Sequence, residues 1–284
     1  MKIEFYNNNP MGFYNETIDI FLENEAQNAI LIKNVTKFKN GEGADDWYCA
    51  IVKDDNGNII TSAMCTPPYN IAMYETGNKH DGEAINLLAR ELFNAGYKPP
   101  GVISEKVTAE IFAESYTKIS GQNTRIHMSL NAMQLDKLAD IKNFAPGYLR
   151  EITREDLSYL PYWVNAFTID CRISTGDIVE SYEYLKNQFG KNTEYVWIDE
   201  IPVAMAGSVG ALTTGTKIGR VYTPPFNRNK SYSTSCVWHL SKLLLDKGNK
   251  FVSLFADADY PQSNKVYQNV GFRNVCLYRE IIFE

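Results

Sequence analysis

The chain has 284 residues, a length that corresponds to about two domains of roughly 150 residues each. Hydrophobic residues make up 44% and charged residues 22%, a composition typical of a globular protein that is folded throughout. Lys and Arg number 28 against 34 Asp and Glu. This net charge of −6 argues against a protein that coats nucleic acid, so we expect no nucleic-acid partner.

The sequence also indicates the compartment and the role of its cysteines. It has no run of 18 apolar residues, and its first residues lack the apolar segment of a signal peptide. We therefore expect no membrane association and a cytoplasmic location. The five cysteines include no C-x-x-C pair, and the three histidines lack metal-ligand spacing, so we expect free thiols and no metal.

The first half of the chain alternates helical and strand patterns. Apolar residues at helical spacing between positions 18 and 30 predict one amphipathic helix. Strands over 47–53 and 59–66 flank Asn56-Gly57, a strong hairpin signal. The remaining predicted features are a helix over 84–93 ended by Gly96, a short apolar segment at 102–103 and a helix over 107–116.

The second half repeats this order of elements. It predicts helices over 156–167 and 178–189, strands over 195–198, 202–209 and 217–223, a helix over 233–246 ended by Gly248, a strand over 251–255 and a short helix between Ser263 and Gly271. Thr223-Pro224-Pro225 lies 157 residues after Thr66-Pro67-Pro68. The two sites and the matching order indicate a diverged tandem duplication, with a boundary at 143/144 beside Pro146-Gly147.

The segment that joins the strand over 217–223 to the next helix is a candidate anion site. It carries Arg228 and Lys230 and leads into a helix N-terminus, where unpaired N–H groups and the helix dipole favour a phosphate or pyrophosphate. The same residues also fit a helix capped by Ser231 or Ser233 with the two cations in a solvated turn. On the local pattern alone, that simpler interpretation is the more frequent one.

Three segments, in this order, resemble the GNAT acetyltransferase superfamily, in particular its tandem bacterial members with a degenerate N-terminal copy. Val221-Tyr222-Thr223-Pro224-Pro225 resembles the strand that faces the cofactor. The segment 228–233 resembles the pyrophosphate loop, and 263–267 with Gly271-Phe272 resembles the C-terminal motif. The resemblance implies an α/β (α+β) fold of two tandem GNAT-like domains, 1–143 and 144–284, each a twisted mixed β-sheet flanked by helices.

The resemblance also implies acetyl-CoA as a co-substrate, held by one site per chain. The cofactor-binding residues would be Val221, Tyr222, Thr223, Arg228, Asn229, Lys230, Ser231, Tyr232, Ser233 and Asn264. Tyr267 matches the tyrosine that protonates the departing CoA thiolate, although a ring at this position also suits simple packing.

The pyrophosphate loop departs from the family pattern, Arg/Gln-x-x-Gly-x-Gly/Ala. Ser231 and Ser233 stand where glycines are expected, and residues 69–82 of the first half contain no such loop. A Cβ at these positions could crowd a phosphate. Because position 231 opens a helix, we expect a helical backbone there and a hydroxyl that donates to phosphate.

The general base and the acceptor site are less visible in the sequence. The strand over 217–223 carries no carboxylate, so the candidates are Glu200, Asp257 and Asp259, acting through water. Acids at turns are more often solvated caps. Trp163 and Phe167 either line the acceptor site or pack in the core.

The function expected from these features is acetyl transfer to a small-molecule or peptide amine by direct attack in a ternary complex. Cys236 lies within a predicted helix with no supporting His, so we expect no covalent enzyme intermediate. A non-catalytic acyl-CoA-binding module and, more weakly, a phosphate-binding regulatory domain are the alternatives. The identity of the amine and the oligomeric state are left open.

Overall fold

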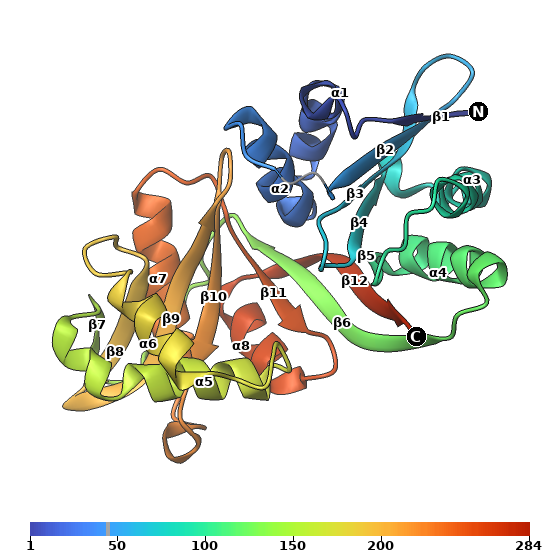
Figure 1. Ribbon diagram of the computed structural model, residues 1–284. Helices are drawn as coiled ribbons and strands as arrows, with labels where there is room; N and C mark the ends of the chain where they lie inside the picture. Colours follow the sequence, from blue (N-terminus) through green and yellow to red (C-terminus); the bar gives the residue numbers. More distant parts are fainter. Residues whose placement is uncertain (44–45) are drawn as a thin grey trace. The chain divides into compact units, whose positions relative to one another are not determined.

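The computed structural model describes residues 1–43 and 46–284 (Figure 1). These residues form two compact units. The first unit consists of residues 1–132 together with 275–284, and the second unit consists of residues 133–274. Within the described residues, no helix combines the length and apolar character needed to cross a membrane.

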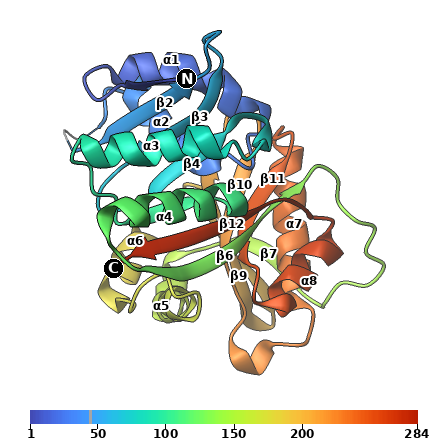
Figure 2. The ribbon, with the colours of Figure 1, turned by 90° about the vertical axis from the view of Figure 1, so that its right-hand side faces the viewer.

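The first unit is a mixed sheet covered by two helices on each face. Its sheet order is β1-β2-β3-β4-β5-β12, in which only β4 and β5 are parallel. The elements are β1 (Lys2–Phe5), α1 (Pro10–Glu23), α2 (Ala29–Lys39), β2 (Tyr48–Lys53), β3 (Ile59–Cys65), β4 (Ile71–Glu75), η1 (Thr76–Asn78), α3 (Gly82–Asn94), β5 (Gly101–Glu105), α4 (Lys106–Ser120) and most of β6 (Thr124–Leu135), completed by β12 (Arg273–Phe283). One core lies beneath α1 and α2 and the other beneath α3 and α4, which run side by side in Figure 2.

The second unit repeats this architecture. Its sheet order is β7-β8-β9-β10-β11, with β10 and β11 parallel and the other pairs antiparallel. The elements are β7 (Tyr148–Glu151), η2 (Arg154–Ser158), α5 (Leu160–Asp170), α6 (Ile178–Lys186), β8 (Glu194–Asp199), β9 (Ile201–Ala211), β10 (Thr216–Tyr222), η3 (Pro225–Asn227), α7 (Tyr232–Asp246), β11 (Val252–Asp257) and α8 (Pro261–Val270). One core lies between the sheet and α5 and α6, and another lies beneath α7 and α8.

The order of elements confirms the duplication, but not through the Thr-Pro-Pro sites. Counting from the start of each unit, β4 corresponds to β10, α3 to α7, β5 to β11 and α4 to α8. Thr66-Pro67-Pro68 follows β3, whereas Thr223-Pro224-Pro225 follows β10, so the two sites are not equivalent. The sequence argument missed β4 because all five of its residues are buried, which removes the alternation that marks a half-exposed strand.

The helix predicted between positions 18 and 30 is wrong as a single element. The chain turns between α1 and α2, and the Asn28 side chain donates to the carbonyl of Phe21 at 3.1 Å. This local side-chain bond replaces a helical one. The hairpin at Asn56-Gly57 is confirmed, with Gly57 at a positive φ of 85°.

The compact units divide the chain differently from the boundary expected at 143/144. The change of unit falls at 132/133, and residues 275–284 pack with the first unit. The reason is that β12 pairs with β5 and contributes Ile281 and Phe283 to the core of α3 and α4. A cut at 143/144 would therefore remove a strand from the first unit.

Candidate functional site

The two parallel strands of the second unit separate toward their carboxyl ends. Thr216 pairs with Val252 and Lys217 with Ser253, and no later pair joins β10 to β11 among the residues described. Figure 1 shows the strands close together at their amino ends and apart at their arrowheads. Their backbone groups beyond Lys217 and Ser253 are therefore open to a partner other than each other.

The segment before α7 presents a row of unpaired backbone donors. From Asn229 to Thr234 the N–H groups donate no hydrogen bond to any described part of the chain. Asn229 (φ 63°) and Ser231 (φ 61°) are both left-handed. We call residues 229–234 the anion loop, because these donors and the positive end of the α7 dipole suit a phosphate group.

The backbone at Ser231 corrects the expectation of a helical residue there. Ser231 is the N-cap of α7, its φ is 61° and its side chain makes no capping hydrogen bond. A left-handed conformation costs a residue with a Cβ roughly 1–2 kcal/mol, whereas glycine adopts it freely. The serine therefore occupies a position whose geometry favours the glycine of the family pattern.

The two cations beside the anion loop differ in how far they are already neutralised. Arg228 Nη2 lies 3.2 Å from Asp170 Oδ2, and Arg228 Nε donates to the Thr223 carbonyl at 3.0 Å. Lys230 is exposed and forms no ion pair within the described residues. Lys230 is thus the more available charge for an anionic ligand.

The predicted strand residues lie at the carboxyl end of β10. Val221 packs toward the core of α7 and α8, while the half-buried Tyr222 lies with its ring centroid 6.4 Å from that of Trp163. The hydroxyl of Thr223 is buried and has no hydrogen-bond partner among the described residues. A buried polar atom without a partner, next to the anion loop, fits a site that a ligand completes.

Two predicted binding residues have side chains with structural contacts, and a third contributes its backbone. The Tyr232 hydroxyl donates to Asp199 Oδ2 at 2.5 Å, and its ring lies in the core. Asn264 Nδ2 donates to the carbonyls of Asp257 and Tyr260 at 2.7 and 2.9 Å, so it holds the turn between β11 and α8. Ser233 lies in the first turn of α7, where its backbone N–H belongs to the anion loop.

Tyr267 is buried, which keeps its phenol protonated over a wider pH range than usual. It is 9% exposed, and its ring centroid lies 6.0 Å from that of Phe272. Burial, with a smaller contribution from Cys171 nearby, raises the pKa of Tyr267 above its usual value, so the hydroxyl stays protonated at neutral pH.

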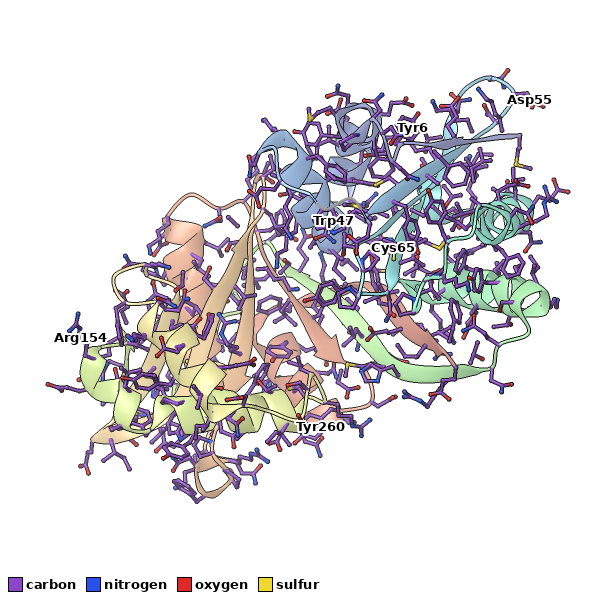
Figure 3. All side chains as sticks on the ribbon, viewed as in Figure 1. Tyr6, Trp47, Asp55, Cys65, Arg154 and Tyr260 are labelled. Carbon is purple, nitrogen blue, oxygen red and sulfur yellow. The ribbon has the colours of Figure 1, made fainter. Side chains whose placement is uncertain are left out.

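Helix α8 begins earlier than the sequence predicted. Its first residue is Pro261, and Tyr260, exposed at the start of the helix in Figure 3, takes the cap position expected of Ser263. The Ser263 hydroxyl donates to the Tyr260 carbonyl at 3.0 Å. Proline at the first helical position explains the earlier start, because its missing N–H costs nothing there.

The three candidate bases differ in position. Asp257 ends β11, one of the two diverging strands, and its Oδ1 accepts the N–H of Asp259 at 2.9 Å. Asp259 is exposed in the following turn. Glu200 is exposed between β8 and β9, with a φ of 58°. Of the three, Asp257 lies on a strand that borders the opening.

Sequence reasoning missed a buried ion pair in the second unit. Glu194 on β8 accepts hydrogen bonds from Arg220 on β10 and from the Tyr184 hydroxyl on α6, the latter at 2.7 Å. An arginine inside the apolar strand over 217–223 was the only sequence signal for it. Trp163 and Phe167 line the core beneath α5 and α6, as the packing interpretation predicted.

The cysteine within α7 is unsuited to nucleophilic attack. Cys236 is fully buried, and burial raises the pKa of its thiol to about 12, which leaves it un-ionised and a poor nucleophile. In the described ranges 1–43 and 46–284, no three His, Cys, Asp or Glu side chains are grouped as metal ligands.

Comparisons with known proteins identify the fold. The sequence matches no family model and no curated protein. Among solved structures, a GNAT-family acetyltransferase from Colwellia psychrerythraea is similar at 13% identity (TM-score 0.56, 84% of this chain and 85% of that one). A tandem GNAT protein from the clavulanic acid biosynthesis pathway matches at 11% identity (TM-score 0.53, 99% and 98%). This chain has a tandem GNAT fold. A GCN5-related N-acetyltransferase from Sphaerobacter thermophilus, at 13% identity, matches it as well (TM-score 0.58, 83% and 80%).

In the first unit, α3 and α4 are the counterparts of α7 and α8, and carboxylates of the chain itself accept the N–H groups at the starts of both helices. The Asp81 side chain accepts the N–H groups of Glu83 and Ala84 at the start of α3, at 3.1 Å each. Glu105 accepts those of Val107 and Thr108 at the start of α4. The anion loop thus has no open counterpart among the described residues of the first unit.

Proposed function

We propose that the chain is an N-acetyltransferase that uses acetyl-CoA, with its site in the second unit. The observation that carries this proposal is the anion loop, whose backbone donors are unpaired at the point where β10 and β11 separate. A fold shared with acetyltransferases supports the reaction type. The amine it acts on has to be found by experiment.

The residues at the opening fit the parts of CoA. The anion loop and Lys230 suit the pyrophosphate, since both the N–H groups and the cation interact with negative oxygens. The free backbone edge of β10 at Val221 to Thr223 suits the amides of the pantetheine arm, which form strand-like hydrogen bonds. The unpaired Thr223 hydroxyl offers one more contact.

The proposed reaction is direct attack of a neutral amine on the thioester carbonyl. A C–N bond forms, the C–S bond breaks, the amine loses a proton to water near Asp257 and the Tyr267 hydroxyl gives its proton to the thiolate. Backbone N–H groups at the opening would stabilise the developing oxyanion. The buried Cys236 takes no part in this scheme, so no acyl-enzyme forms.

A non-catalytic acyl-CoA-binding module is the alternative, and one observation favours it. The Cβ of Ser231 stands at a left-handed position of the loop, where it crowds the closest approach of a phosphate. In that case the loop would bind CoA weakly and turnover would be lost.

Thiol release from acetyl-CoA, measured over a panel of small amines, amino acids and peptides, tests the proposal. Amine-dependent release together with CoA binding in a calorimeter supports the enzyme. CoA binding without release across the panel supports the binding module. A chain that binds neither CoA nor acetyl-CoA contradicts both.

A further inference from the structure

A buried ion pair lies at the irregular point of β10. The Glu194 side chain is 4% exposed and that of Arg220 is 19% exposed. Arg220 Nε donates to Glu194 Oε1 at 3.1 Å, its Nη2 contacts the same oxygen, and the guanidinium lies 4.5 Å from the centre of the Tyr184 ring. The pair therefore joins β8, β10 and α6.

A glycine on the intervening strand β9 leaves the space in which this ion pair forms. Gly207 on β9 lies between Glu194 and Gly219 in the register of the sheet. A Cβ at Gly207 would lie 2.6 Å from a carboxylate oxygen of Glu194. The carboxylate therefore occupies the space above Gly207 and reaches the next strand.

The backbone of Arg220 forms a bulge. From Gly219 to Tyr222 the strand β10 advances three residues, while its partner β9 advances two, from Gly207 to Met205. Arg220 has a φ of 49°, which is unfavourable for a residue with a long side chain. Such a bulge turns the following residues and releases backbone groups from the ladder.

The residues that follow the bulge are those proposed to contact the pantetheine arm. Val221, Tyr222 and Thr223 come directly after Arg220, beyond the last pair between β10 and β11. Glycine would adopt this φ without strain, so backbone geometry alone does not call for arginine here. The side chain supplies instead the contact with a fixed carboxylate.

We propose that Arg220, held by Glu194 and Tyr184, is a positioning residue that fixes the main chain of Val221 to Thr223 for the thioester. This inference rests on the proposed function, because it assigns the bulge a task in that reaction. A buried ion pair by itself is weak evidence of stability, which makes a local role for this pair the sharper explanation.

The double variant Arg220→Gly, Glu194→Gln separates positioning from stability. It removes both charges, leaves a residue that tolerates positive φ and keeps an amide oxygen to accept the Tyr184 hydroxyl. Thermal unfolding should stay close to wild type, and the Kd of CoA should change less than kcat, because the variant leaves the anion loop intact. Amide hydrogen exchange at 219–223 should rise roughly tenfold or more, and kcat for the most active amine should fall by a similar factor.

The control removes a pair of opposite charges elsewhere in the second unit. Lys242→Gln, Asp246→Asn deletes the exposed pair on α7, whose atoms lie 2.5 Å apart, and should change neither exchange at 219–223 nor kcat. Wild-type exchange at 219–223 in the Arg220→Gly, Glu194→Gln chain would overturn the inference, as would exchange that rises evenly over the whole unit. If the wild-type chain releases no thiol with any amine, the proposed function fails and the task of Arg220 in the reaction fails with it, while the exchange measurement still decides whether the ion pair fixes the main chain at 221–223.

Discussion

The two units differ in whether side chains cap the N-termini of two equivalent helices. In the first unit, Asp81 caps α3 and Glu105 caps α4, while the buried Glu75 accepts a hydrogen bond from the Thr108 hydroxyl at 3.2 Å. In the second unit, neither α7 nor α8 has a side-chain cap. One copy supplies negative charge to its own helices, and the other has no carboxylate cap at either helix start.

The first unit also places two carboxylates beside the imidazole of His80, at the starts of the same helices. His80 Nδ1 lies 3.6 Å from an oxygen of Glu75 and 3.6 Å from an oxygen of Glu105. A pyrophosphate in this place would meet two carboxylates at short range, with one imidazole between them. The comparison teaches that a repeated fold can keep its architecture while side chains cap two helix starts in one copy and leave the equivalent two uncapped in the other.

The largest expected effect comes from Tyr267, the seventh residue of α8. The seventh residue of α4 is the fully buried Phe112, which has no hydroxyl. Tyr267→Phe copies the first unit and should lower turnover by roughly 10²-fold, the scale of a lost general acid, while the melting temperature hardly changes. Steady-state kinetics and thermal unfolding measure the two quantities.

The raised pKa of Tyr267 adds a pH dependence to this prediction. The acid form is the protonated phenol, so its contribution is lost only as pH rises through a pKa above the usual value. Wild-type kcat should therefore show no decline due to Tyr267 between about pH 7 and 9.5. In Tyr267→Phe, a melting temperature lowered by several degrees with unchanged turnover would instead identify Tyr267 as a packing residue.

Tyr278→Phe is the matched control for Tyr267→Phe. It removes a hydroxyl that donates to the Gln27 carbonyl in the first unit, and it should leave turnover unchanged.

The second expected effect comes from giving the anion loop a carboxylate like those of the first unit. Ser231→Asp should weaken CoA binding by about tenfold or more, because the new charge repels the pyrophosphate. Ser231→Asn is the neutral control, since Asn has a similar shape and tolerates the left-handed backbone. Calorimetry at low salt should give one CoA per chain, and equal affinity for the Asp and Asn variants would contradict the anion loop as the binding site.

Sequence reasoning located the loop from composition and spacing but not from conformation. Arg228, Lys230 and the following helix are visible as residue types, and the hairpin at Asn56-Gly57 follows from turn chemistry. The φ of Ser231 is not visible in this way, because serine at a helix start ordinarily has an extended or helical backbone and its residue type carries no sign of a left-handed one. The contact of Arg228 with Asp170 joins residues 58 apart in sequence, beyond any local pattern.

The same limit explains the errors in the fold. Strand β4 is buried on both faces, so its sequence shows no alternation of apolar and polar residues. Strand β12 belongs to the first unit, although it follows β1 by more than 250 residues in the sequence. Long-range strand pairing is set by tertiary packing rather than by local propensity. The repeated order of elements was recoverable because helix caps and turns are local signals.

A smaller effect tests how the two cations share the phosphate. Lys230→Gln should weaken CoA binding by about two- to fivefold, and the loss should shrink as salt rises. Asp170→Asn should act in the opposite direction by a similar factor, because it releases Arg228 from its exposed ion pair. Calorimetry at two salt concentrations measures both changes. Tighter binding in the Lys230 variant would show that the loop does not act on anions.

The smallest effect, and the one that separates the enzyme from the impaired binding module, is expected from Ser231→Gly. The backbone at 231 has a φ of 61°, so glycine relieves roughly 1–2 kcal/mol of strain and costs up to about 1 kcal/mol in chain entropy. The net gain of about 0.5–1 kcal/mol should raise the melting temperature by about 1–4 °C. CoA binding should tighten no more than a few-fold, since the N–H groups of the loop are already without a partner within the described residues. Ser233→Gly makes the same substitution two residues later on a helical backbone, where it relieves no strain and should lower the melting temperature.

Weaker CoA binding in Ser231→Gly would mean that the hydroxyl itself donates to phosphate. A tenfold or greater gain in CoA affinity would mean that the serine blocks the loop, and it would favour the non-catalytic module.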